Sequence, residues 1–171
     1  GTPRRVLLGF DGDEPIFAID SFDDFPGGIF ISAGNSLTHL QPDTSLGDNE
    51  DHEDPILSDA TNMAVSSSHY LVATTFENYG VNNIYLATQE KSSGNTSGHF
   101  LTNATAFNSE INGNPWIVDL GTDQFALFWE RIELGMVNVC SVLLDDAGKP
   151  IGQIQTWRDC SLSTMVPIGI N

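Results

Sequence analysis

Carboxylates crowded into short turns are the residues of this chain best suited to bind a ligand. The densest group lies between residues 43 and 54 and includes Asp48, Glu50, Asp51 and Asp54. Ca²⁺ takes about six to eight oxygen ligands, so a loop of this kind could wrap the ion. The competing interpretation is a solvated acidic loop that binds no metal. Ca²⁺ is therefore the cofactor hypothesis for this loop.

A second acidic turn offers two further carboxylates. Asp11 and Asp13 flank Gly12, and Glu14 follows directly. Two carboxylates separated by one residue could supply oxygens to the same Ca²⁺ ion. Turn formation alone also selects an Asp-Gly pair, because both residues suit the backbone of a tight turn. Both interpretations remain open for Asp11 and Asp13.

Catalytic motifs are absent from the sequence. It contains no G-x-S-x-G, H-E-x-x-H or Cys–His signature, and its four histidines have no spacing typical of metal ligands. Paired carboxylates for glycoside hydrolysis remain compatible with a chain this rich in acids, since such pairs are formed in space. We assign no catalytic residue, and the sequence favours a protein that is not an enzyme.

Aromatic residues gather in the last third of the chain and suggest a different kind of site. Trp116 follows the polar turn residues at 112–114, so its ring and the side chain of Asn114 are the candidate ligand-binding pair. An exposed indole ring beside polar groups can stack on the face of a sugar. Trp129 and Phe125 follow the apolar alternation instead, and we expect both rings to fill the space between sheets.

Two cysteines and two sequons bear on the cellular compartment. Cys140 and Cys160 are the only cysteines, and either a disulfide or two separate thiols fits their spacing. The sequons begin at Asn95 and Asn103, at a predicted turn and a predicted strand end, where glycosylation would find exposed chain. Together with the acidic, lysine-poor composition, these features favour a secreted or extracellular glycoprotein.

The elements that position these residues repeat along the chain. Apolar alternation at residues 70–75 recurs at 125–130, and that at 83–88 recurs at 138–143. The spacing is about 55 residues in both cases, and we call this spacing the repeat length. A fainter copy of the same two segments lies one repeat length upstream. Each copy predicts four short strands joined by hairpin turns, and no window has a sustained helical pattern. The chain is therefore expected to be all-β, one repeat domain over 1–171 with units at about 4–42, 56–105 and 112–160.

The third copy carries the clearest motif. Its pattern F-x-x-x-W-E, then V-x-x-x-L-x-D-D-A-G-K-P-I-G, resembles the blade core of β-propellers, and the matching residues are Phe125, Trp129, Glu130, Val139, Leu143, Asp145, Asp146, Gly148 and Gly152. The resemblance covers nearly the whole chain and implies a fold without an activity. A β-trefoil is the rival, because Gln155-Thr156-Trp157 is similar to the Q-x-W motif of ricin-type lectins.

The number of units has a further consequence. Propellers usually have about four to eight blades, whereas this chain holds three units. An open stack leaves two apolar faces uncovered, so we expect either self-association or a continuation of the chain.

Net charge limits the partners. The formal charge is −17, with six basic and 23 acidic residues. Such a surface repels nucleic-acid phosphates and anionic membranes. The expected function is a non-enzymatic extracellular recognition or adhesion module, with glycans or other extracellular proteins as ligands. The alternatives are a structural subunit of an extracellular assembly or filament, and a fragment of a propeller-fold glycan-processing enzyme.

Overall fold

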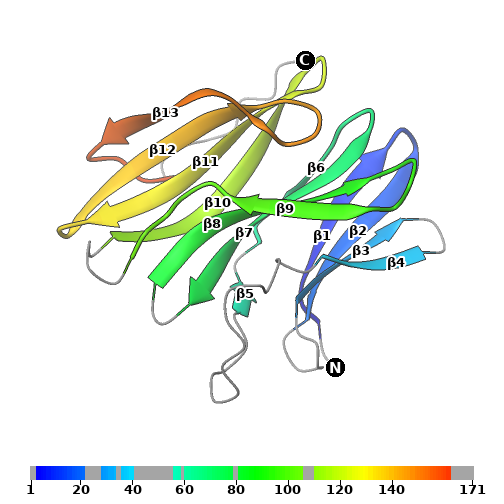
Figure 1. Ribbon diagram of the computed structural model, residues 1–171, viewed down its shortest axis with the longest axis horizontal. Helices are drawn as coiled ribbons and strands as arrows, with labels where there is room; N and C mark the ends of the chain where they lie inside the picture. Colours follow the sequence, from blue (N-terminus) through cyan, green and yellow to red (C-terminus); the bar gives the residue numbers. More distant parts are fainter. Residues whose placement is uncertain are drawn as a thin grey trace.

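The protein is a stack of three open antiparallel β-sheets that follow one another in chain order. The computed structural model describes residues 3–21, 28–33, 36–40, 56–58, 60–78, 81–105 and 110–162. These residues form thirteen strands and no α-helix. Figure 1 shows the three sheets side by side, with the first on the right and the third at the upper left. The predicted all-β fold of three repeated, blade-like units is confirmed.

The first sheet has the strand order β1-β2-β3-β4, a simple meander. Its strands are β1 (Pro3–Asp11), β2 (Glu14–Ser21), β3 (Gly28–Ala33) and β4 (Ser36–Leu40). The β1–β2 turn contains Gly12, whose φ of 61° lies in the left-handed region that glycine tolerates best.

The middle sheet has the order β5-β7-β8-β9, and the short strand β6 also pairs with β7. Its strands are β5 (Ile56–Ser58), β6 (Met63–Val65), β7 (His69–Asn78), β8 (Val81–Glu90) and β9 (Thr96–Phe100). The extra strand β5 was not expected from the sequence. Residues 70–76 and 84–89 are buried without interruption, which is the pattern of strands covered on both faces.

The third sheet has the order β10-β11-β12-β13. Its strands are β10 (Glu110–Gly121), β11 (Gln124–Glu133), β12 (Met136–Leu144) and β13 (Pro150–Arg158). β11 and β12 are joined by a two-residue turn, because β11 ends at Glu133 and β12 begins at Met136. Leu134 and Gly135 have φ of 51° and 78°, the left-handed pair that a tight hairpin turn requires.

The strand register recurs at the repeat length. In the first sheet Ala18 on β2 lies opposite Ile31 on β3. The middle sheet pairs Ala73 with Leu86, and the third pairs Phe128 with Ser141. Each member of a pair lies one repeat length from its counterpart in the next sheet. Because side chains alternate between the two faces of a strand, equal register gives each sheet two equivalent faces.

We name these faces by residues of the second strand. The forward face carries Ile16 and Ala18 in the first sheet, Leu71 and Ala73 in the middle sheet, and Ala126 and Phe128 in the third. The backward face carries, in the same order, Pro15 and Phe17, Tyr70 and Val72, and Phe125 and Leu127.

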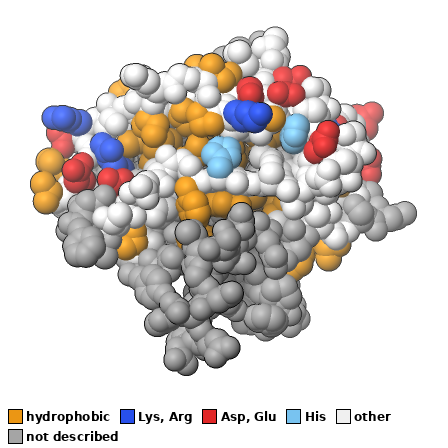
Figure 2. All heavy atoms as spheres, in the orientation of Figure 1, with side chains coloured by type: hydrophobic (Ala, Val, Ile, Leu, Met, Phe, Trp, Pro, Cys, Tyr) orange, Lys and Arg blue, Asp and Glu red, His pale blue; other side chains and the backbone are white. Residues whose placement is uncertain are grey.

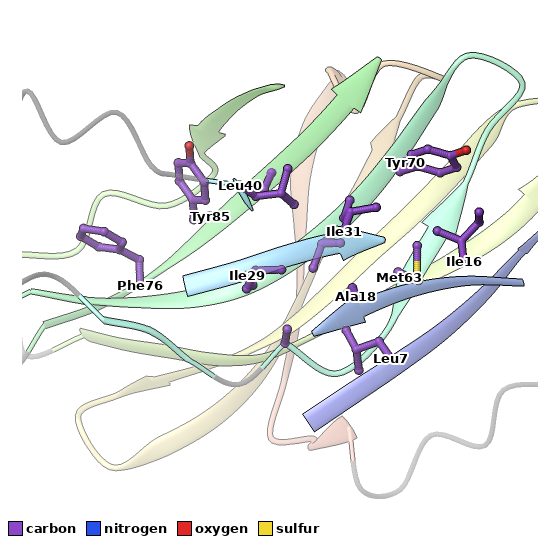
Figure 3. Close-up of a cluster of buried hydrophobic side chains, with 13 residues drawn as sticks. Leu7, Ile16, Ala18, Ile29, Ile31, Leu40, Met63, Tyr70, Phe76 and Tyr85 are labelled. Atoms are coloured by element: carbon purple, nitrogen blue, oxygen red, sulfur yellow. The ribbon is translucent and has the colours of Figure 1, made fainter. Parts of the chain in front are cut away.

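Two hydrophobic cores lie between the sheets. The first core joins the forward face of the first sheet to the backward face of the middle sheet; it includes Ile16, Ala18, Ile29, Ile31, Tyr70, Val72 and Tyr85. Figure 3 shows these side chains pointing toward one another from the strands of the two sheets. Burial of this apolar surface, at about 25 cal/mol per Å², is what holds the two sheets together.

The second core repeats the arrangement between the middle and third sheets. It includes Leu71, Ala73, Ile84, Leu86, Phe125, Leu127, Trp129 and Val142. Trp129 and Phe125 are each 1% exposed, so their expected burial between sheets is confirmed. The indole Nε1 of Trp129 donates a hydrogen bond of 3.1 Å to Oδ1 of the buried Asn112, which satisfies its only polar group.

Candidate functional site

The forward face of the third sheet has no sheet packed against it among the described residues, and it carries large apolar side chains. The exposed fraction of the residue lies between 40% and 48% for each of four of them: Trp116, Leu143, Ile151 and Trp157. Trp116 lies opposite Phe128 in the sheet, and the Phe128 and Trp157 rings are 6.3 Å apart at 34°. The face therefore presents a row of three aromatic rings across the sheet.

A shallow hollow lies within this aromatic row. Its volume is about 220 Å³, and it is lined by Phe128, Val139, Trp157 and Cys160. The Cys160 thiol donates a hydrogen bond of 3.3 Å to the carbonyl oxygen of Trp157, which leaves an apolar surface around it. A lining of this kind fits an apolar group of a partner better than a charged ligand.

Glu130 accepts two hydrogen bonds at the edge of the same face. Its Oε2 accepts a hydrogen bond of 2.6 Å from Nδ2 of Asn114, and its Oε1 accepts one of 2.7 Å from the backbone N–H of Leu162. Asn114 itself lies in a break of register between Gly113 and Trp116, with a left-handed φ of 50°. Glu130 thereby fixes both the bulge that carries Trp116 and the chain that follows β13.

The backward face of the first sheet is the other end of the stack. Its exposed apolar side chains are Val6, Leu8, Phe10 and Phe17. Leu8 and Phe17 are cross-strand partners. Phe17 is 38% exposed, whereas its counterparts Val72 and Leu127 in the other two sheets have no exposed area. The same position is thus buried wherever a sheet precedes it and open where none does. Figure 2 shows one side of the molecule in the orientation of Figure 1, and the hydrophobic side chains that reach the surface there lie mostly over the middle and third sheets.

Polar contacts between neighbouring sheets also repeat. Asp11 in the β1–β2 turn accepts a hydrogen bond of 2.7 Å from Nζ of Lys91 in the middle sheet. One repeat length further along the chain, Ser66 takes the position of Asp11 and Asp146 that of Lys91. Ser66 donates a hydrogen bond of 2.8 Å to the carbonyl oxygen of Asp146. The same two positions therefore connect each sheet to the next.

The middle sheet also brings a serine, a histidine and an aspartate together. The Ser68 hydroxyl donates to Oδ2 of Asp146 at 2.7 Å and lies 2.6 Å from Nδ1 of His69. A hydroxyl has only one proton to donate. Because Ser68 uses that proton in its hydrogen bond to Asp146, the contact with His69 requires an N–H at Nδ1 of His69 that donates to the Ser68 oxygen. A serine nucleophile would instead donate its proton to the histidine. The group forms a link between the middle and third sheets.

The candidate calcium ligands lie in two settings. Asp48, Glu50, Asp51 and Asp54 fall outside the described residues. Asp11 engages both of its carboxylate oxygens, with Lys91 and with the Tyr70 hydroxyl at 3.2 Å, and Asp13 is exposed beside it. Burial, followed by the nearby Asp11 carboxylate, raises the pKa of Tyr70. Within the described ranges, no three or more His, Cys, Asp or Glu side chains are placed to share a metal ion.

The two cysteines are free thiols and form no disulfide. Cys140 points into the second core, on the backward face of the third sheet, and its Sγ lies 3.6 Å from Oγ1 of Thr156. Cys160 lines the hollow on the forward face of the same sheet. The sheet separates them, which a count along the sequence could not reveal. Burial raises the pKa of the Cys140 thiol and keeps it protonated at neutral pH.

The two sequons differ in their surroundings. Asn95 is exposed in the β8–β9 turn, where its backbone carbonyl accepts a hydrogen bond of 2.9 Å from the N–H of Glu90. Asn103 is also exposed, and it lies between two residues that the side chain of Asn83 binds: Oδ1 of Asn83 accepts hydrogen bonds from the Thr102 hydroxyl and from the Ala104 N–H. Both acceptor side chains are therefore exposed.

Sequence reasoning named part of the third-sheet face. Trp116 lies on it, and Asn114 lies in the bulge beside Trp116, where its side chain donates a hydrogen bond to Glu130. It did not single out Trp157, Phe128 or the apolar face of the first sheet. The signal that identifies them is the repeat itself: one repeat length before the buried Val72 stands Phe17, and one repeat length after the buried Ala73 stands Phe128.

Comparison with known proteins adds no family. The chain matches no protein-family model, and neither the curated proteins nor the solved structures include a significant match to it. Among the described residues there is no helix of the length and hydrophobicity needed to cross a membrane.

Proposed function

We propose that this chain is a non-enzymatic structural module that works by docking further blades on its two end faces. One observation carries the proposal. Large apolar side chains are exposed on the outer faces of both end sheets: Phe17 on the first sheet, whose counterparts Val72 and Leu127 are buried, and Trp116, Leu143, Ile151 and Trp157 on the third. Soluble monomers seldom expose contiguous apolar patches of this kind, and such patches mark interaction surfaces.

The middle sheet shows what a covered blade looks like. Its second strand β7 is buried along residues 70–76, with Tyr70 and Val72 in one core and Leu71 and Ala73 in the other. Covering the end faces would give the outer sheets the same environment. Each fully buried large apolar side chain contributes about 1.5–3 kcal/mol, so a few of them suffice to drive association.

Sedimentation of the chain and of a variant blocked at both faces tests this function. The blocked variant carries Leu8→Lys and Phe17→Glu on the first sheet, and Leu143→Lys and Ile151→Glu on the third. Each pair consists of cross-strand partners, so the new charges can pair, and the net charge stays at −17. We expect the unchanged chain to assemble and the blocked variant to sediment at 18.5 kDa.

A matched control changes apolar residues away from both end faces. Leu134→Glu with Met136→Lys places one Glu and one Lys, the pair used on each end face, at the β11–β12 turn, where both side chains are already exposed. This control should assemble as the unchanged chain does. An unchanged chain that sediments as a monomer at every concentration would refute the proposal.

Glycan recognition is the second candidate. Trp116 and Trp157 are exposed on one face beside the Asn114–Glu130 pair, and exposed indole rings with polar neighbours are the groups that stack on sugars. A glycan array of the unchanged chain and of Trp116→Ala tests it. Binding that the substitution abolishes supports this candidate, and an empty array leaves docking as the function.

An extracellular location belongs to the same proposal. It is supported by the sequon at Asn95, which lies in an exposed turn away from both end faces. Expression through a secretory pathway, followed by enzymatic removal of N-glycans, checks it. A shift in mass that Asn95→Gln removes is the expected result, and an unmodified secreted chain would contradict glycosylation.

A further inference from the structure

We propose that the partner on these end faces is a second copy of this chain, seated head to tail. The forward face of the third sheet of one copy packs on the backward face of the first sheet of the other. This inference rests on the proposed function and adds the identity and direction of the partner. Its premise is that both faces already meet inside each molecule, in the two internal interfaces.

Every interface between sheets in this molecule has the same polarity. A forward face packs on a backward face in the first core, where Ala18 and Val72 lie on the two sides. The second core repeats this with Ala73 and Leu127. Neither core packs two forward faces together or two backward faces together. A third interface of the same kind needs one forward and one backward face, and those are the two that the stack leaves open.

The residues at the open positions are chemically suited to that contact. Each end face has four positions that lie one repeat length along the sequence from residues at the centre of an internal interface. On the third sheet these are Ala126, Phe128, Val139 and Ser141; on the first sheet they are Pro15, Phe17, Phe30 and Ser32. Six of these eight residues are apolar and none is charged. On the third sheet Ala126, Val139 and Ser141 are already buried, so the surface that a partner would cover there is that of Phe128 and of the exposed Trp116, Leu143, Ile151 and Trp157.

The polar link between sheets has open counterparts as well. Inside the stack, the first hairpin turn of each sheet contacts the turn region that follows the third strand of the next sheet, as Asp11 does with Lys91 and Ser66 with Asp146. Among the described residues, no sheet follows the first hairpin turn of the third sheet, at Gly121. In the first sheet, the position equivalent to Lys91 is Ser36, at the start of β4, and the described residues place no sheet before it.

Head-to-tail contacts differ from symmetric ones in what they generate. A contact between unlike faces leaves one open face on each partner, so it either closes into a ring or continues. Two copies would supply six blades, within the range of about four to eight that closed propellers have. A contact between like faces would instead pair two copies and leave the other faces exposed.

Two variants, each blocked at one face, separate these arrangements. The first-face variant carries Leu8→Lys and Phe17→Glu, and the third-face variant carries Leu143→Lys and Ile151→Glu. In the head-to-tail arrangement neither variant can associate with itself, because each contact needs both faces. A mixture of the two retains one complete contact, so it forms a pair that cannot grow.

The measurement is sedimentation of each variant alone and of their equal mixture. We expect each variant alone to sediment at 18.5 kDa, with self-association at least about a hundredfold weaker than that of the unchanged chain, since the contact would remove the new charged pair from water. The mixture should sediment at about twice the mass of one chain. Circular dichroism and urea unfolding establish that both variants are folded.

The outcomes distinguish this inference from the proposed function. If either variant alone forms a pair, like faces meet, and the head-to-tail seating is overturned while docking itself stands. If the mixture stays monomeric although the unchanged chain assembles, the seating is again overturned. If the unchanged chain never assembles, both the inference and the proposed function fail.

Discussion

At the scale of single residues, the buried polar groups decide how much one substitution costs. Asn112 and Trp129 are almost fully buried, and the indole N–H of Trp129 has Oδ1 of Asn112 as its acceptor. Nδ2 of Asn112 donates in turn to Oε1 of Glu110 at 2.9 Å and to the carbonyl oxygen of Asn82 at 3.3 Å. One amide side chain thus completes the hydrogen bonding of three neighbours.

Asn112→Ala should therefore lower the free energy of unfolding by about 2–3 kcal/mol, because the buried indole N–H loses its acceptor. Trp129→Phe removes that N–H, so the double variant should be less destabilised than the sum of the single variants by about 1 kcal/mol. Urea unfolding of the four proteins measures the difference. Strict additivity of the two changes would show that the hydrogen bond contributes nothing.

His99 gives the stability of the fold a dependence on pH. Its Nε2 is buried without a hydrogen-bond partner among the described residues, and burial lowers its pKa from 6.5. The folded state therefore favours the neutral ring more than the unfolded state does. This stabilisation is present above about pH 6.5 and is lost as the pH falls through the lower pKa of the folded state.

The measurement is the unfolding free energy of the unchanged chain and of His99→Gln from about pH 8 to about pH 5, the interval in which histidine changes charge. We expect the unchanged chain to lose more stability than the variant as the pH falls. Parallel curves for the two proteins would show that His99 is not responsible for the loss.

At the scale of elements, the hairpin turns hold neighbouring sheets in place. The β12–β13 turn lies against the middle sheet at Gly148. A Cβ at this position would come within 2.8 Å of Cδ2 of Leu86 and 3.0 Å of Cγ2 of Thr88. Glycine is required here for two reasons, because its φ of 79° also lies in the left-handed region.

Gly148→Ala should lower the free energy of unfolding by about 2–4 kcal/mol, through backbone strain together with overpacking of the core. Gly121→Ala is the matched control, because Gly121 has the same φ of 79° and nothing lies within 4 Å of an added Cβ. The control should cost only the strain, about 1–2 kcal/mol. Equal losses in urea unfolding would mean that the turn does not pack tightly on the middle sheet.

The elements also show how far a sequence can be interpreted alone. The spacing between Val72 and Leu127 was sufficient to predict three units of strands joined by hairpin turns, because alternating burial leaves its period in the sequence, whereas the extra strand β5 was not predicted. The turn at Leu134 was missed, since leucine is uncommon at left-handed φ. The opposite placement of Cys140 and Cys160 was missed as well, because it depends on a bend of the chain after β13. Two uncovered apolar faces were expected, but Phe17 was not named among their residues, since an apolar residue looks alike in a covered and an uncovered strand.

At the scale of the whole molecule, the charge opposes association of the copies. Each chain carries −17, so two copies repel one another until salt screens them. Raising the ionic strength from about 0.1 M to about 1 M shortens the screening length from about 10 Å to about 3 Å. We therefore expect association to strengthen with NaCl, as sedimentation at several concentrations would show. Association that weakens in salt would indicate an interface held by ion pairs.

The common register also restricts how a chain of this kind can change in length. Duplicating or deleting one whole repeat unit keeps every forward face opposite a backward face, because the pairs Ala18–Ile31 and Ala73–Leu86 recur unchanged. Adding one residue inside a strand such as β7 would turn the side chains beyond it to the opposite face. During evolution such an array can therefore gain or lose entire repeats. Small insertions are confined to the turns and to the connections between sheets.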